Sequence, residues 1–142
     1  MELDELLAYS APYLDASGFE LTKKLTNRRD GRPMPFGDQQ WTFTARGMDL
    51  EIIRDRSQLW VTLGLRGQTT FVYQAWARAV GIPFEDGLSL QGQVEFLTSN
   101  LPQFVSFIES HPDAGALVQR ANWQLVAPTI GLDPHVPPPG SV

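Results

Sequence analysis

The residues of this chain best suited to chemistry are its carboxylates, 16 Asp and Glu side chains among 142 residues. Asp49, Glu51 and Asp55 fall within one short stretch, and two carboxyl groups held close together can separate in pKa and act as an acid and a base. However, Asp49 stands at a predicted strand start and Asp55 at a predicted turn, where short acidic side chains bind backbone amides. We favour this structural role, because strongly shifted pairs need burial that turns seldom provide.

Other catalytic side chains are scarce. The chain has no cysteine and two histidines, His111 and His135, so a thiol nucleophile is excluded and a metal site of imidazole and thiolate is nearly so. Ser57 and Ser106 have no histidine that would serve as their base. The sequence therefore predicts a protein that is not an enzyme and that uses no cofactor and no metal.

The sharpest local feature is the triplet Arg54, Asp55 and Arg56, at the tip of a predicted hairpin. Guanidinium groups bind carboxylates or phosphates in bidentate geometry, so the triplet could contact a partner. The plainer interpretation is a solvated turn, in which Asp55 binds backbone amides and the arginines discourage pairing between sheet edges. For the triplet taken alone we favour the plainer interpretation.

The net charge of −5 narrows the possible partners. Nucleic-acid-binding proteins normally present a basic stripe to phosphates, whereas an acidic surface suits a basic protein partner. No apolar run approaches the ~18 residues needed to span a bilayer, and the acidic first residues do not resemble a signal peptide. We expect a cytoplasmic protein that binds neither nucleic acid nor membrane.

The elements that must position these side chains begin with an amphipathic helix. Leu3, Leu6 and Leu14 recur at helical spacing. Pro12 is expected to kink this helix or end it early, and Gly18 is a natural stop because glycine accepts the left-handed backbone that closes a helix.

Four alternating segments then predict strands, around residues 19–25, 41–46, 50–53 and 59–64, with a Pro/Gly-rich loop over residues 27–38. The other links are short and favour an antiparallel meander. One face of this sheet is predicted to be uncovered and to carry Thr42, Thr44, Glu51, Ile53, Trp60 and Thr62. On it, Ile53 and Trp60 are expected to pair across their hairpin as an exposed apolar spot.

Helical periodicity returns after residue 70, with Ser89 and Asn100 as predicted N-caps and Pro112 at the start of a last helix. The predicted fold class is α+β: an N-terminal helix, a four-stranded antiparallel meander, and three to four C-terminal helices packed on one sheet face. We predict a single domain over residues 1–132 and a Pro-rich disordered tail over residues 133–142.

Residues 50–61, with the sequence LEIIRDRSQLWV, follow the short acidic, leucine-rich helix. This arrangement resembles small bacterial immunity proteins of polymorphic or contact-dependent toxin systems, in which a hydrophobic strand, an Arg-Asp-Arg turn and a second hydrophobic strand recur. The resemblance covers about the first half of the chain. It implies a cytoplasmic, non-enzymatic protein that binds a cognate toxin and blocks its active site or the approach of its substrate. An acidic inhibitor would be steered toward a basic toxin, for instance a nuclease.

The predicted partner-binding residues combine the hairpin tip, one suspect tryptophan and an acidic loop: Arg54, Asp55, Arg56, Trp60, Glu85 and Asp86. Two alternatives stay open, a type III-like secretion chaperone that holds an effector segment and an enzyme that uses carboxylates alone. An apolar groove on a dimer would favour the chaperone, an acidic rim around Trp60 the immunity protein, and a deep cleft with paired carboxylates the enzyme. The oligomeric state is left open.

Overall fold

Helix α1 (Leu3–Ala16) opens the computed structural model, which describes residues 1–26, 28–29, 32–33 and 39–138. Its apolar stripe, which includes Leu6 and Leu14, is buried in the core. The helix ends before Gly18 (φ 81°), as predicted. It continues through Pro12, so the expectation of an early end is wrong. Leu14, two residues after Pro12, is buried, and its packing holds the last turn of the helix in place although the proline lacks an N–H donor.

Four strands form an antiparallel sheet in the order β1-β4-β5-β6, which confirms the predicted meander. Their bounds are β1 (Glu20–Thr26), β4 (Gln39–Ala45), β5 (Met48–Asp55) and β6 (Gln58–Leu65). Two short strands, β2 (Arg28–Arg29) and β3 (Arg32–Pro33), pair with each other. The rest of the predicted loop over residues 27–38 lies outside the described residues.

Two-residue turns join β4 to β5 and β5 to β6. Both central residues of each turn have positive φ: Arg46 (51°) with Gly47 (78°), and Arg56 (51°) with Ser57 (69°). Turns of this kind match the right-handed twist of the strands that they connect. They place Asp55 opposite Gln58 at the tip of the second hairpin.

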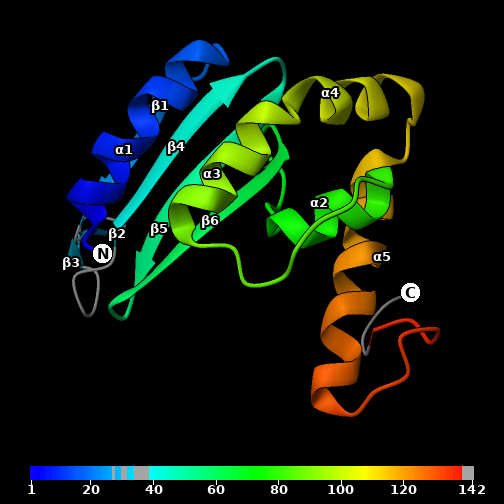
Figure 1. Cartoon of the computed structure of the whole chain (residues 1–142). Helices are drawn as coiled ribbons and strands as arrows, with labels where there is room; N and C mark the ends of the chain where they lie inside the picture. The colour runs from blue at the N-terminus through cyan, green and yellow to red at the C-terminus, as the bar shows by residue number, and fades with distance from the viewer. Residues whose placement is uncertain (27, 30–31, 34–38, 139–142) are drawn as a thin grey trace.

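One face of the sheet is covered by α1 and α3 (Leu90–Ser99), which pack against each other, and α3 also lies on β6 (Figure 1). The side chains that alternate toward these helices are almost fully buried, among them Leu50, Ile52, Val61 and Leu63. This layer is the main hydrophobic core. It leaves the other face of the sheet without a helix in the part of the chain that the structure describes.

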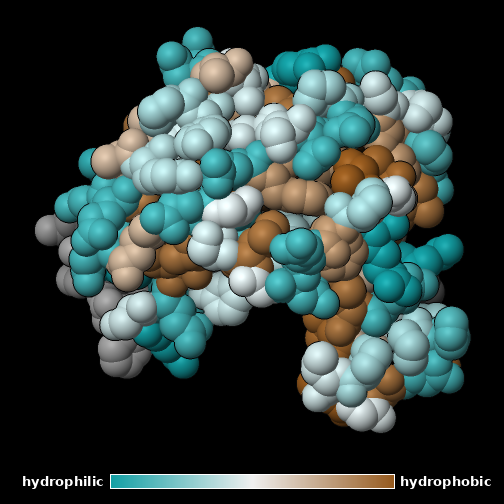
Figure 2. Space-filling model, in the orientation of Figure 1, coloured by the Kyte–Doolittle hydropathy of each residue, from teal (hydrophilic) through white to brown (hydrophobic). Residues whose placement is uncertain are grey.

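The remaining helices extend beyond β6: α2 (Tyr73–Val80), α4 (Leu101–Ser110), α5 (Ala114–Val126) and the 3-10 helix η2 (Ala127–Ile130). The indole of Trp76 on α2 donates to the carbonyl of Leu63 on β6 at 2.6 Å, which joins the helices to the sheet. Figure 2 shows that the far half of α5 projects from the body and leaves a hollow between itself and the hairpin end of the sheet. The order of elements confirms the predicted α+β fold class.

The two predicted N-caps differ in what they do. Ser89 accepts a hydrogen bond from the Gly92 amide at 3.1 Å, as expected for the start of α3. Asn100 does stand between α3 and α4, but its side chain donates to the Phe96 carbonyl at 2.9 Å. Asn100 therefore closes α3 with its side chain and makes no side-chain cap on α4.

The end of the described chain turns back along α5. Residues 133–138 contact that helix, and residues 139–142 lie outside the described part. The domain boundary at residue 132 and the disordered state of the tail stay predictions.

Candidate functional site

The candidate site is the sheet face that turns away from α1 and α3, called here the open face. The strand register arranges its side chains in three rows across β1, β4, β5 and β6. The row nearest the hairpin tip holds Leu25, Gln40, Ile53 and Trp60. The middle row holds Lys23, Thr42, Glu51 and Thr62, and the far row holds Glu20, Thr44, Asp49 and Gly64.

Hydroxyl and carboxylate groups form a hydrogen-bonded network over the far row. Thr44 donates to Asp49 Oδ1 at 2.7 Å, and its hydroxyl lies 2.8 Å from that of Thr22. The Gly67 amide donates to the second oxygen, Oδ2, of Asp49 at 3.0 Å. Asp49 is thus a buried acceptor that fixes a backbone amide, which is the structural role that its position predicts.

A loop of residues 66–70 folds over one end of the open face and is tied to the middle row. Thr62 donates to the Thr70 hydroxyl at 2.8 Å, and Thr70 donates to Glu51 Oε2 at 3.1 Å. Gly64 makes this approach possible, because a Cβ there would lie 2.7 Å from the Thr69 carbonyl oxygen. The strands and this loop enclose a polar cavity of about 400 Å³.

The carboxyl group of Glu51 is half-buried in the wall of the cavity. Its partial burial raises its pKa above the ordinary value of 4.5, and the nearby charge of Asp49 adds to the rise. The hydrogen bond from Thr70 and the charge of Lys23 oppose the rise. Burial outweighs these partners because removal from water disfavours the charged form.

The row nearest the tip gives the open face an apolar border. Ile53 and Trp60 are register partners, as predicted, and the Trp60 side chain is 46% exposed. Leu25 and Gln40 continue the row across β4 to β1. An exposed tryptophan beside ordered polar groups is typical of an anchor at protein–protein contacts.

The structure brings some of the predicted partner-binding residues together and separates others. Asp55 and Arg56 are exposed at the hairpin tip, next to the row of Trp60. Arg54 is half-buried and pairs with Leu59, so it alternates toward the helix-covered face. Asp55 alternates with Ile53 and therefore shares the open face with Trp60, whereas Arg54 does not.

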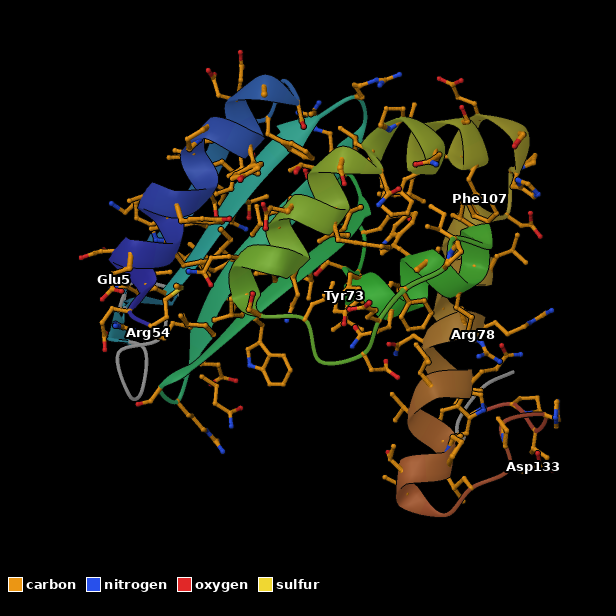
Figure 3. The ribbon with its side chains drawn as sticks, viewed as in Figure 1. Glu5, Arg54, Tyr73, Arg78, Phe107 and Asp133 are labelled. Carbon is orange, nitrogen blue, oxygen red and sulfur yellow. The ribbon has the colours of Figure 1, made fainter. Side chains whose placement is uncertain are left out.

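Glu85 and Asp86 occupy a different element. Both are exposed on the loop between α2 and α3, and the Glu85 carbonyl accepts from the buried Tyr73 hydroxyl at 2.7 Å. Figure 3 labels Tyr73 at the start of α2, on the side of the molecule that carries the helices. The acidic loop leads into α3, which packs on the helix-covered side of the sheet, so Glu85 and Asp86 are not part of the open face.

Sequence reasoning missed two contributors to the cavity. A β-bulge at Thr22, where the register shifts between Leu21 and Lys23, lets Thr22 and Lys23 both line the open face. The loop of residues 66–70 supplies Arg66, Gly67 and Gln68 to the cavity wall. Alternation cannot find a bulge, and the glycines that flank Leu65 and Arg66 are the one sequence signal that a close approach occurs there.

The described part of the chain also bears on metal binding, membrane insertion and carboxylate catalysis. Within the described ranges, no group of three or more His, Asp or Glu side chains is arranged to hold a metal ion. No helix in the same part of the chain is long and apolar enough to cross a membrane. The carboxylate pair of the enzymatic alternative, Asp49 and Glu51, lies in the cavity with both side chains engaged in hydrogen bonds.

Comparison with known proteins yields no match to a protein-family model, to a curated protein or to a solved structure. The proposals below therefore rest on the residues and geometry of this chain.

Proposed function

We propose that this protein is a cytoplasmic immunity protein that binds and neutralises a cognate bacterial toxin, with the open face as its contact surface. The observation that carries the proposal is the composition of that face, where the exposed Trp60 and its partner Ile53 border a cavity that contains Asp49 and Glu51. Aromatic anchors beside ordered polar groups are the usual centre of a specific protein interface.

Charge supports a basic partner. The chain carries a net charge of −5. The cavity of the open face balances two carboxylates, Asp49 and Glu51, against two exposed cations, Lys23 and Arg66, so the support comes from the charge of the whole chain. Complementary charge accelerates association by 10-fold or more at low ionic strength. A toxin with a basic active-site cleft fits these properties, and binding there would block the approach of its substrate.

The test begins with the protein as bait in a lysate of its source cells, followed by expression of each captured protein with and without the bait. A captured protein that kills cells, and whose toxicity co-expression cancels, is the result expected. Capture of nontoxic proteins alone would overturn the immunity function.

The contact surface is tested by substitution. Trp60→Ala, and the double variant Arg56→Ala, Trp60→Ala, should weaken toxin binding by about 5-fold or more, since interface anchors commonly contribute over 1 kcal/mol. The matched control is Glu85→Ala with Asp86→Ala on the α2–α3 loop. If the loop variant loses toxin binding while Trp60→Ala binds as tightly as the natural chain, the contact surface is the α2–α3 loop and not the open face.

A secretion chaperone is the second candidate, and one observation favours it. An apolar groove of about 620 Å³ runs between α1 and the edge strand β1, and Leu21 in its wall is 48% exposed. An extended apolar segment could lie along such an edge. Capture of a nontoxic secreted protein through its N-terminal segment, lost in Leu21→Ala and kept in Trp60→Ala, would establish the chaperone instead.

A further inference from the structure

The outer side of α5 is covered by the chain's own proline-rich segment. After η2 the backbone reverses at Gly131 (φ 75°), and residues 133–138 return along the helix. Figure 3 labels Asp133 beside the far half of α5. The helix contributes one exposed stripe at helical spacing, called here the α5 groove: Ala116, Gln119, Arg120, Trp123 and Gln124.

One hydrogen bond joins the segment to the groove. The indole N–H of Trp123 donates to the Val136 carbonyl at 2.6 Å. This carbonyl precedes Pro137 and Pro138, so the acceptor sits at the start of a stiff, extended stretch. An aromatic wall with an N–H aimed at such a carbonyl is the way in which proteins hold proline-rich ligands.

The segment also makes hydrogen bonds within itself. The His135 amide donates to Asp133 Oδ1 at 2.8 Å, and the Val136 amide donates to the Asp133 carbonyl at 3.2 Å. Asp at the first position and Pro134 at the second are the residues that such a turn prefers. Little conformational entropy is then lost when the segment docks.

The segment fills the groove only in part. A cavity of about 480 Å³ remains between residues 134–138 and the helix. Val136 stays 54% exposed although its carbonyl is held. The segment therefore leaves part of the groove open, and the groove has room for a ligand that makes more contacts than the tail does.

We infer that the α5 groove is a binding site for a proline-rich segment of a partner protein, of the type acidic residue, proline, two residues, proline. The chain's own residues 133–138 occupy the site as an internal competitor. The chemistry of the ligand is read from this occupant: a turn with a carboxylate at its start, a carbonyl for Trp123, and proline rings along the groove. This inference stands on α5 and is independent of the function proposed for the open face.

The test uses the full chain and a capped synthetic peptide, acetyl-DPHVPP-amide, as the probe. The indole N–H signal of Trp123 in ¹⁵N spectra, assigned by its loss in Trp123→Phe, reports occupancy. The full-length variant Pro134→Gly, Pro137→Gly, Pro138→Gly weakens the internal competitor. We expect this variant to bind the peptide at least 5-fold more tightly than the natural chain, with the Trp123 signal moving toward its natural position.

Two controls give the test its specificity. The peptide acetyl-DAHVAA-amide should bind at least 5-fold more weakly, and Trp60→Phe should leave binding unchanged. Absence of any Trp123 shift in the glycine variant at millimolar peptide, or equal binding of both peptides, would overturn the site. A further contrary result would be self-association of the natural chain as its concentration rises, with a matching move of the Trp123 signal. That result would reject a partner protein as the ligand and assign the groove to the tail of a second copy.

Discussion

At the scale of single residues, the open face shows how burial alters an acidic side chain in two ways. Asp49 is buried and fully engaged with Thr44 and the Gly67 amide, so it acts as a structural acceptor. Glu51, two residues along the same strand, has one hydrogen-bond donor, Thr70, and a raised pKa. Two carboxylates that are neighbours on one strand face therefore differ. Asp49 is held by hydrogen bonds, and Glu51 binds a proton more readily than a glutamate in water does.

Glu51 predicts a dependence of stability on pH. Because its pKa is raised in the folded state, the folded chain binds the proton more tightly than the unfolded chain does. The contribution of Glu51 to stability is then greatest below its ordinary pKa of 4.5 and decreases as the pH rises from there toward the folded value. Glu51→Gln keeps an acceptor for Thr70 without the charge, so its Tm relative to the natural chain should rise between pH 4 and pH 7 by about 1–3 °C.

Thermal unfolding followed by circular dichroism at both pH values measures this difference. Glu20→Gln, which neutralises an exposed carboxylate on β1 of the same sheet, serves as the matched control. A Glu51→Gln variant that loses stability relative to the natural chain as the pH rises would contradict the assigned direction.

At the scale of elements, long-range packing holds local structure that the residues alone oppose. Pro12 lies inside α1 and removes the hydrogen bond to the Ala8 carbonyl, yet the helix continues because Leu14 and Phe19 are buried beyond it. Arg56 and Ser57 adopt positive φ because the register of β5 with β6 leaves two residues for the turn.

Pro12→Ala should therefore stabilise the protein. The substitution restores an amide donor within an exposed part of α1, and we expect the free energy of unfolding to rise by about 1–3 kcal/mol. Urea denaturation measures the change. Pro112→Ala, which removes an exposed proline outside any helix, should give no gain, because the loss of a proline makes the unfolded chain more flexible; a gain of equal size there would show that the restored amide within α1 is not the cause.

Gly64 tests the approach of the 66–70 loop to the sheet. Gly64→Ala would place a Cβ 2.7 Å from the Thr69 carbonyl oxygen and 2.9 Å from the Thr70 Cα, so backbone must move and stability should fall by about 1–3 kcal/mol. Gly92→Ala is the control, because its Cβ would meet only side-chain atoms, Ser89 Oγ at 3.3 Å and Leu88 at 3.5 Å or more. There the better helix propensity of alanine should leave stability unchanged or raise it by up to about 1 kcal/mol. Equal effects in the same denaturation assay would argue against the close approach.

At the scale of the whole molecule, the sheet and the helices beyond it are joined through Trp76. Its buried indole donates to Leu63 on β6, and its ring lies 5.5 Å from that of Phe104 on α4. A second link pairs Phe71 with Leu63 in both directions, at 2.8 and 2.9 Å. The open face and the α5 groove thus stand on one connected core.

Trp76→Phe should weaken the whole fold and not one half of it. Loss of the indole hydrogen bond and the smaller ring should lower the free energy of unfolding by about 2–3 kcal/mol. Circular dichroism and tryptophan fluorescence should report the same unfolding midpoint, and Trp60→Phe on the surface should change it little. Separate midpoints for the two probes would show that the helices and the sheet unfold independently.

The element types, the meander, the open-face residues and the Ile53–Trp60 pair were determined by the sequence alone, because alternation and turn chemistry are local properties. Tertiary structure decided the rest. Packing allows α1 to continue through Pro12, places the 66–70 loop on the sheet and holds the Glu85 loop against Tyr73 on α2. These outcomes depend on contacts between residues far apart in the chain, which no local pattern encodes. The hydrogen bond from Trp123 to the Val136 carbonyl likewise holds the proline-rich segment against α5.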